Sequence, residues 1–201
     1  MPFNSEKEFE DALIAKLTEL DNQWSRTILE YKTEDDLIAN WAEILFNNNN
    51  ETDKLNGVPL TRTEMTQIIS QINGESPFAL NRRLNSRYIS ITRDNPKDTL
   101  HNGKRVDLFL FDKDEIAAGR SVYQIARQPR FHTSSEILGN RRGDLMLLIN
   151  GMPLYHIELK NTPVKVEQAC NQISKYMQHG VFTGFFSFVQ VFVAMTPSSP
   201  R

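Results

Sequence analysis

Two carboxylates and one ammonium group are predicted to meet at the edge of a β-sheet in the second half of the chain. Asp144 begins an apolar segment, and Glu158 and Lys160 lie near the end of the next one. Side chains two positions apart on a strand share a face, so Glu158 and Lys160 should point the same way. In an antiparallel hairpin the start of the first strand lies beside the end of the second, which brings Asp144 to the same edge.

This grouping is suited to metal-dependent hydrolysis of a phosphate ester. Charges between apolar strands are unfavourable unless they are paired or hold a metal. Two carboxylates, together with waters and a substrate phosphate, are ligands that Mg²⁺ accepts, and the bound ion lowers the pKa of its water and neutralises charge in the transition state. Lys160 could orient or deprotonate that water, or stabilise the developing charge, and the sequence leaves these roles open.

The alternative is that Glu158 and Lys160 decorate an exposed edge and that Asp144 is a turn residue. An acid two positions before a lysine occurs by chance in many proteins, so that motif alone is weak. The apolar flanks of both strands and the tight turn between them favour the functional interpretation. His156 shares the strand face of Glu158, and we expect a hydrogen-bonded core histidine there rather than a residue lining the site.

The segments around these residues have clear structural signals. Residues 145–149 are an apolar run short enough for a buried strand, and Asn150-Gly151 is a strong hairpin turn that leads into a strand over residues 154–160. An amphipathic helix follows Pro163 and should end at Gly180. Residues 188–194 then predict a buried closing strand.

The first third of the chain is predicted to be helical. Helix starts are indicated at Ser5 and Thr61 by capping boxes with Glu8 and Glu64, and at Thr33 by the apolar spacing that follows. Residues 47–50, four asparagines, predict an exposed loop. Further strands are expected over residues 88–91, 106–111 and 121–125.

Composition excludes several classes of protein. The 201 residues suit one domain, 39% of them are apolar, and no apolar run is long enough to cross a membrane. The N-terminus lacks a secretory signal pattern. A single cysteine excludes an internal disulfide, fits a reducing cytosol and, with only four histidines, makes a closed zinc site improbable.

The charges are unevenly distributed along the chain. Residues 1–75 carry 15 acids and 6 bases, a balance of −9, whereas residues 76–201 carry 10 acids and 17 bases, a balance of +7. This asymmetry permits contacts with a phosphate backbone without establishing them. The basic residues form two clusters, one of Arg82, Arg83, Arg87, Arg93, Lys97, Lys104 and Arg105, and one of Arg120, Arg127, Arg130, Arg141 and Arg142. Arg141 and Arg142 adjoin Asp144 and are the best candidates for DNA contacts, with Lys104 and Arg105 as further candidates.

The segment from Gly143 to Asn161 resembles the PD-(D/E)xK nuclease core in the R subunit of type I restriction enzymes. In that family an Asp opens a strand, an Asn-Gly-x-Pro-Leu hairpin follows, and an Ile-Glu-Leu-Lys strand completes the site. All three features occur here, at Asp144, at residues 150–154 and at residues 157–160. One departure is Gly143, where the family usually carries Pro or a larger side chain.

The resemblance extends to two helices. Gln172 and Tyr176 are similar to the Gln-x-x-x-Tyr motif of the RecB-like branch of these nucleases, and their spacing places both on one side of a helix. Residues 5–14 look like the family's opening helix, whose acidic residue lines the active site; the matching position is Glu10. The resemblance covers the first helix and residues 104–196, and little of residues 22–100 can be aligned.

The resemblance implies a mixed α/β (α+β) fold with a restriction-endonuclease-like core: a central mixed sheet flanked by helices in αβββαβ order, with an N-terminal helical insertion. Residues 1–201 would be one endonuclease domain, with a first core helix over 1–20, a variable helical and loop region over 22–100, and the nuclease core over 104–196. Asp144 and Glu158 would hold the metal, and Lys160, Gln172, Tyr176 and Glu10 would complete the catalytic site.

The family also implies a larger machine in the cytoplasm. The expected activity is Mg²⁺-dependent cleavage of double-stranded DNA, with Mn²⁺ as a possible substitute, coupled to translocation by an ATP-driven motor. No Gly-x-x-x-x-Gly-Lys-Ser/Thr phosphate loop occurs here, so the motor is expected downstream of this chain. Methylation and specificity subunits are the expected partners. The alternatives are a free-standing repair or junction nuclease of the same superfamily and a non-catalytic DNA-binding or docking module.

Overall fold

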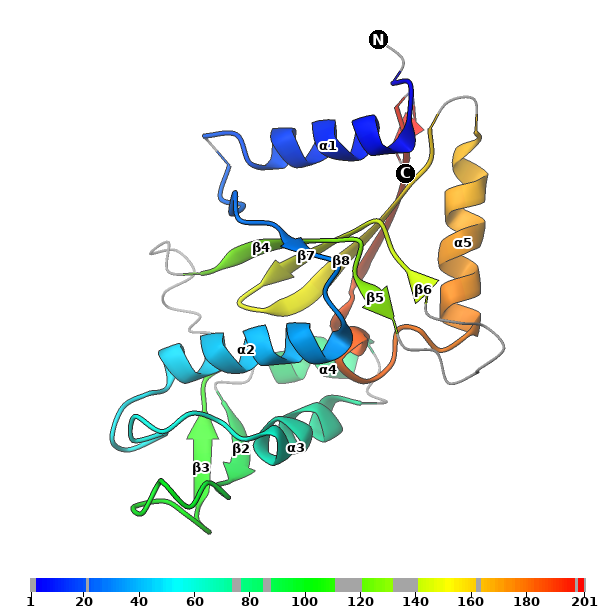
Figure 1. The fold of residues 1–201 in the computed structure, drawn as a ribbon. Helices are drawn as coiled ribbons and strands as arrows, with labels where there is room; N and C mark the ends of the chain where they lie inside the picture. The colour runs from blue at the N-terminus through cyan, green and yellow to red at the C-terminus, as the bar shows by residue number, and fades with distance from the viewer. Residues whose placement is uncertain are drawn as a thin grey trace.

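A mixed sheet of six strands lies at the centre of the molecule, as the computed structural model shows (Figure 1). The structure describes residues 3–20, 22–73, 77–84, 88–110, 121–131, 141–161, 164–197 and 199–200. In spatial order the strands are β1 (Leu29–Glu30), β4 (Tyr123–Arg127), β7 (Leu145–Ile149), β8 (Met152–Leu159), β9 (Val191–Thr196) and β10 (Ser199–Pro200). The pairs β1–β4 and β8–β9 are parallel, and the other neighbours are antiparallel.

Helices cover both faces of this sheet (Figure 1). The helices of the described residues are α1 (Glu6–Leu17), α2 (Glu34–Asn48), α3 (Arg62–Ile72), α4 (Pro77–Leu84), α5 (Val166–Gln178) and the 3₁₀ helix η3 (Gly184–Phe188). Of these, α3 packs against β2 and η3. Two small sheets pair β2 (Ile89–Thr92) with β3 (Arg105–Leu108), and β5 (Arg130–Phe131) with β6 (Arg141–Arg142). None of the helices in the described residues is long and apolar enough to cross a membrane.

The predicted mixed α/β fold is confirmed, and the elements α1, β4, β7, β8, α5 and β9 follow the expected αβββαβ order. Two strands differ from expectation. Residues 105–108 pair with β2 at a distance from the central sheet, because the β2–β3 hairpin packs against α3. The closing strand begins at Val191 and not at residue 188, because the aromatic segment before it winds into η3.

Local hydrogen bonds explain where the helices begin. The hydroxyl of Ser5 accepts from the N–H of Glu8, and Thr33 and Thr61 each start a helix with a complete capping box. The expectation of an exposed loop at residues 47–50 is wrong in two ways, because α2 continues through Asn48 and because Asn49 is fully buried. Its side chain donates to the carbonyls of Leu45 (2.9 Å) and Phe109 (3.0 Å) and accepts from the Phe109 N–H (2.8 Å), so it attaches the end of α2 to the chain beyond β3.

The turn between β7 and β8 has the geometry that Asn-Gly predicts. Asn150 and Gly151 have φ values of 50° and 81°, as a two-residue turn with two left-handed positions requires. A side chain at Gly151 would also collide with α2, because an added Cβ would lie 2.9 Å from the Cα of Trp41. The turn therefore fixes the start of the hairpin and the position of α2 against it, and the strand pairing then shifts by one residue between Leu147 and Leu148.

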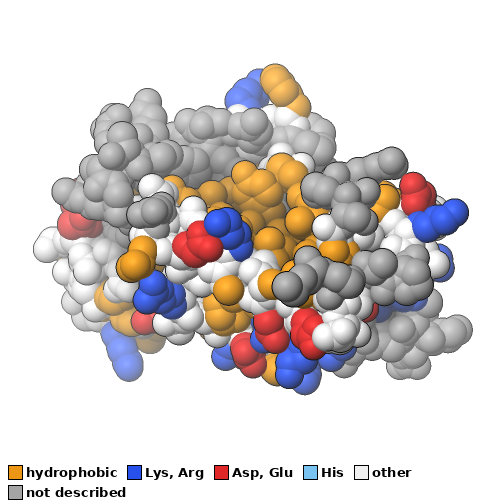
Figure 2. Space-filling view, turned by 90° about the horizontal axis from the view of Figure 1, so that it is seen from above, with side chains coloured by type: hydrophobic (Ala, Val, Ile, Leu, Met, Phe, Trp, Pro, Cys, Tyr) orange, Lys and Arg blue, Asp and Glu red, His pale blue; other side chains and the backbone are white. Residues whose placement is uncertain are grey.

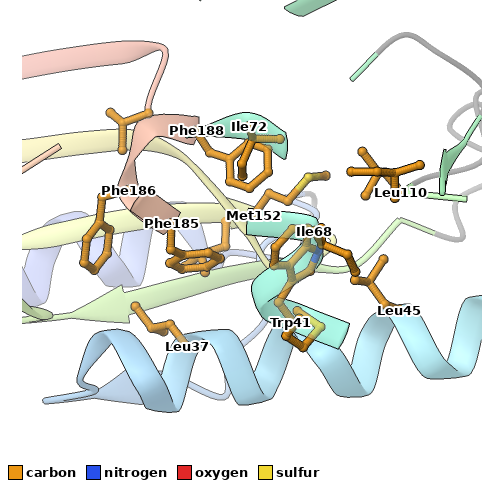
Figure 3. Close-up of a cluster of buried hydrophobic side chains, with 14 of the residues drawn as sticks. Leu37, Trp41, Leu45, Ile68, Ile72, Leu110, Met152, Phe185, Phe186 and Phe188 are labelled. Carbon is orange, nitrogen blue, oxygen red and sulfur yellow. The ribbon is translucent and has the colours of Figure 1, made fainter. Parts of the chain in front are cut away.

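Of the three apolar clusters in the described residues, the two largest lie on opposite sides of the sheet and a small one lies between α5 and β9. The larger joins the sheet to α2, α3 and η3, and Trp41 packs there with its ring centroid 5.2 Å from that of Phe188 (Figure 3). The smaller lies under α1 and contains Phe9, Leu145 and Ile157. Seen from the side of α1, apolar side chains gather at the centre of the surface, with charged groups mostly around them (Figure 2).

Candidate active site

The β7–β8 hairpin places the two predicted acids opposite each other. Leu145 pairs with Ile157, so Asp144, just before β7, faces Glu158 near the end of β8. The carboxylate of Asp144 accepts a hydrogen bond of 2.7 Å from the main-chain N–H of Leu159, which holds it against the end of β8. Glu158 is fully buried, whereas Asp144 is partly buried. Strand pairing, shifted by one residue between Leu147 and Leu148, thus brings the two carboxylates together.

Lys160 completes this group at the end of β8. Its ammonium lies 3.3 Å from Oε1 of Glu158 and 3.0 Å from Oε1 of Glu6, and it donates to the carbonyl of Leu159 at 2.8 Å. Burial lowers the pKa of Lys160, but the hydrogen bond to Glu6 and the charges of Glu158 and Asp144 outweigh it, so the pKa stands above its usual value. Lys160 is therefore a cation in this site and not a free base.

The two acids hold their protons more tightly than ordinary carboxyls do. Burial and then the charge of Glu158 raise the pKa of Asp144 to about 7. Burial likewise raises the pKa of Glu158 to about 7, although Lys160 opposes the rise. Oε2 of Glu158 has no hydrogen-bond partner among the described residues. A buried acid pair with an unpaired oxygen is suited to a divalent cation, which would favour the ionised form of both groups.

These acids fit a metal site that also uses ligands from elsewhere. In the described part of the chain, no cluster of three or more His, Cys, Asp or Glu side chains could enclose an ion. Mg²⁺ commonly takes one or two carboxylates and completes its shell with water and substrate phosphate oxygens. Asp144 and Glu158 match that donor set, and their role as metal ligands stays a prediction.

Gln172 and Tyr176 form a hydrogen-bonded chain on α5. The amide of Gln172 donates to the Tyr176 hydroxyl at 2.7 Å, and this hydroxyl donates to the carbonyl of Arg142 at 2.8 Å. Burial, and then the negative charge of Glu158, raise the pKa of Tyr176 to about 12. The chain thus links α5 to β6, two residues before Asp144, and the Tyr176 hydroxyl lies within electrostatic reach of the site.

Glu10 is buried on α1, but its carboxylate contacts Arg127 and Gln128 and not Lys160. It pairs with Arg127 on β4, and its second oxygen lies 3.3 Å from the side-chain amide of Gln128. The main-chain N–H of Gln128 donates to the carbonyl of Asp144 at 2.7 Å, so Glu10 supports the backbone behind the site. The acid of α1 that contacts Lys160 is Glu6, one turn earlier.

Glu6 and Arg127 were not identified from the sequence. Glu6 and Glu10 are four residues apart and share one helical face, so the pattern cannot tell which of them reaches the site. Arg127, interpreted as one of a DNA-binding cluster, instead pairs with Glu10 and with Asp11 (2.7 Å). Its place in the sequence carries no motif that would have revealed this role.

His156 is buried in an aromatic cluster and lacks the expected hydrogen bonds. Neither ring nitrogen has a partner within the described residues, although Nε2 lies 3.4 Å from Oε2 of Glu158. Burial lowers its pKa to about 4, against the opposing charge of Asp144. Its neighbours are Phe131, Phe182 and Tyr176, with ring centroids 5.1 to 5.9 Å away. The prediction of a satisfied core histidine is wrong, since the residue is in the core but unsatisfied.

The candidate DNA-contacting residues fall into two separate places. Arg141 lies beside the site with its guanidinium carbon 5.9 Å from the centre of the Tyr176 ring, and Arg142 next to it is exposed. Lys104 and Arg105 are exposed on the β2–β3 hairpin, at the end of the molecule away from α1 and the acid pair (Figure 1). The structure does not bring these two residues to the site.

Arg93 is not part of a phosphate-binding cluster. It is fully buried and pairs with Glu64 at 2.7 Å and with Asp98 at 3.0 Å. The predicted positions Arg87 and Arg120, and the side chain of Arg83, lie outside the described residues.

Comparison with known proteins shows which family of proteins has sequences similar to this chain. Residues 4–198 match the family described as the type I restriction enzyme R protein N terminus. The chain is similar to the SsaAORF53P endonuclease subunit of Staphylococcus saprophyticus, with 32% identity over 81% of this chain and 16% of the relative. It is also similar to the SauCOLORF180P endonuclease subunit of Staphylococcus aureus (29%, over 96% of this chain and 18% of the relative). The EcoprrI endonuclease subunit of Escherichia coli shares 26% identity over 57% of this chain and 41% of the relative. The chain thus spans less than a fifth of the two staphylococcal relatives.

Proposed function

Because the chain belongs to the family of type I restriction enzyme R protein N-terminal regions, we propose that it is the endonuclease domain of such a subunit. It would hydrolyse phosphodiester bonds in double-stranded DNA. The observation that carries this proposal is the arrangement of Asp144, Glu158 and Lys160, in which strand pairing sets a fully buried and a partly buried acid opposite each other beside an ammonium group. Relatives named as endonuclease subunits support the same assignment.

Asp144 and Glu158 would hold Mg²⁺, or Mn²⁺ in its place. Their raised pKa values and the unpaired Oε2 of Glu158 support this assignment. When bound, the ion would lower the pKa of a ligated water and offset charge on the scissile phosphate. The N–H of Leu159 would keep Asp144 oriented, and the Glu158–Lys160 contact would keep the second acid in place.

Lys160 would act as a cation. Its raised pKa and its contact with Glu6 keep it protonated, which suits stabilisation of a phosphate oxygen or orientation of a water better than removal of a proton. Among the roles that the sequence leaves open for Lys160, these observations support electrostatic stabilisation.

The supporting residues would act around this centre. Gln172 and Tyr176 would hold the β6 segment in place and present polar groups to the DNA backbone, and Arg141 and Arg142 would contact phosphates next to the site. Glu10 would stabilise the site from behind through Arg127 and Gln128. Lys104 and Arg105 could contact only a remote part of a bound duplex.

The rest of the machine is proposed from the family. The complete subunit would couple cleavage to ATP-driven translocation of DNA through motor domains outside this chain. It would work with methylation and specificity subunits in the cytoplasm, and the recognition sequence would be set by another subunit. These statements concern the whole protein, of which this chain covers a small share.

The test uses the complete protein assembled with its partner subunits. Asp144→Asn, Glu158→Gln and Lys160→Ala should each reduce Mg²⁺-dependent cleavage of plasmid DNA by about a hundredfold or more, with ATP hydrolysis unchanged. Lys175→Ala, at an exposed position on α5, is the control and should cleave normally. If all three variants cut like the unaltered protein, the domain is a docking module and the proposal is wrong. Cleavage without ATP or partner subunits would point instead to a free-standing nuclease.

A further inference from the structure

His156 is an unusual residue to find in an apolar core. It is fully buried, with ring nitrogens that have no hydrogen-bond partner in the described part of the chain. The surrounding rings of Phe131, Phe182 and Tyr176 would accommodate an apolar side chain without that penalty. A buried polar group without a partner in a native protein calls for an explanation, and function is one of the common ones.

The imidazole packs directly against the main chain that leads into Asp144. A Cβ added to Gly143 would lie 2.7 Å from Cε1 of His156 and 3.0 Å from Cε2 of Phe131. Gly143 does not adopt a positive φ, so its backbone conformation alone does not require glycine. The close approach of the His156 ring leaves no room for a Cβ and therefore requires glycine at this position. His156 thus occupies space that a side chain before Asp144 would otherwise take.

On its other side the same ring faces the second acid. Nε2 of His156 lies 3.4 Å from Oε2 of Glu158, the oxygen that has no hydrogen-bond partner, whereas Oε1 of Glu158 is already held by Lys160. A neutral imidazole carries one ring proton, and with that proton on Nε2 a modest closing of the 3.4 Å separation would form the hydrogen bond that this structure does not show. The ring therefore lies between the backbone of one acid and the carboxylate of the other.

We propose that His156 is a positioning residue that sets the separation and orientation of Asp144 and Glu158. Its ring would buttress Gly143 on one side and donate an Nε2 hydrogen bond to Oε2 of Glu158 on the other. This inference rests on the proposed role of the two acids as metal ligands. Donors behind metal-binding carboxylates commonly contribute tenfold or more to metal affinity.

The experiment measures Mn²⁺ binding to this chain by calorimetry or electron paramagnetic resonance, together with the melting temperature and Mg²⁺-dependent cleavage by the complete complex. His156→Leu keeps the volume and removes the donor, and His156→Gln places an amide near the position of Nε2. We expect His156→Leu to bind Mn²⁺ about tenfold more weakly without loss of melting temperature, and His156→Gln to restore binding to within about threefold. Phe192→Leu, beside the same ring, should lower the melting temperature and leave Mn²⁺ affinity unchanged.

A second pair of variants tests the contact with Gly143. Gly143→Ala should lower the melting temperature by about 5 °C and weaken Mn²⁺ binding, and Gly143→Ala combined with His156→Ala should lose less than the sum of the two single losses, because the clash is removed. If His156→Leu binds Mn²⁺ like the unaltered chain, or if the two changes are simply additive, the positioning role is refuted. Asp144→Asn separates the two proposals. If both Asp144→Asn and His156→Leu bind Mn²⁺ normally, the metal site itself is misassigned. If Asp144→Asn loses Mn²⁺ binding and His156→Leu does not, only the role of His156 fails.

Discussion

Replacing Glu158 with Gln should make this chain more stable in the absence of a divalent cation. Burial raises the pKa of Glu158 from 4.5 to about 7, so the ionised carboxylate is held in the folded state at a cost. One pKa unit corresponds to about 1.4 kcal/mol, and the shift sets an upper limit of about 3 kcal/mol. Since Asp144 shares the repulsion and Gln loses the charge contact with Lys160, we expect a gain of about 1 to 2 kcal/mol.

The sign of the effect depends on pH. Below pH 4.5 the Glu158 carboxyl is protonated in both the folded and the unfolded chain, and the free energy of unfolding carries no penalty from it. Between pH 4.5 and about 7 the unfolded chain releases its proton first, so the free energy of unfolding of the unaltered protein falls. Above about pH 7 the penalty is complete. The raised pKa of Asp144 acts in the same direction.

Urea denaturation in EDTA at pH 5 and at pH 8 provides the measurement. Glu158→Gln should be more stable than the unaltered chain at pH 8, and the difference should shrink at pH 5. Glu43→Gln, on the exposed face of α2, should show no such dependence. Added Mg²⁺ should stabilise the unaltered chain more than the variant. An equal or lower stability of Glu158→Gln at pH 8 would refute the reasoning.

Three other changes test the framework around the site by urea denaturation. Tyr176→Phe removes a hydroxyl that both donates and accepts a hydrogen bond, and should lower the free energy of unfolding by about 1 kcal/mol; no loss would mean that these bonds do not form. Gly151→Ala should lower the free energy of unfolding by about 2 kcal/mol more than Gly57→Ala does. Both glycines have positive φ, but only at Gly151 would the added Cβ collide with the main chain of another element; equal losses would contradict this close contact. Arg93→Ala should lower the free energy of unfolding by about 3 to 5 kcal/mol, because it leaves two buried acids uncompensated. Arg62→Ala, which removes an exposed ion pair, should lower it by at most about 1 kcal/mol.

The sequence predicts those parts of the fold and site that local chemistry determines. Asn150-Gly151 specifies the turn, and the turn brings Asp144 and Glu158 to the same edge of the sheet. A one-residue register shift between Leu147 and Leu148, which the sequence does not reveal, sets the two acids directly opposite each other. The helix starts follow from side chains that bond to nearby main-chain N–H groups. Each of these inferences needs only neighbours in the sequence or the regular pairing of two adjacent strands.

Features that depend on how elements dock could not be predicted. Whether Glu6 or Glu10 reaches Lys160 depends on the angle and shift of α1 over the sheet, and both residues satisfy the same helical pattern. Asn49 looks like a loop residue until Phe109, sixty positions away, supplies its partners. Lys104 and Arg105 lie at the start of β3, which belongs to a separate hairpin, so their nearness in sequence to the nuclease core is misleading.

The charge balance of the site connects its stability to its proposed activity. Three carboxylates (Glu6, Asp144 and Glu158) and one ammonium (Lys160) sum to −2 when all are ionised. Protons on the acid pair, or one divalent cation, can each offset that charge, so the two compete for the same oxygens. Lys160 cannot neutralise the three carboxylates alone, because its single positive charge is shared between Glu6 and Glu158. The same burial that makes the empty acid pair unfavourable would strengthen its attraction for a cation, so the stability lost in the free site is what suits it to bind metal.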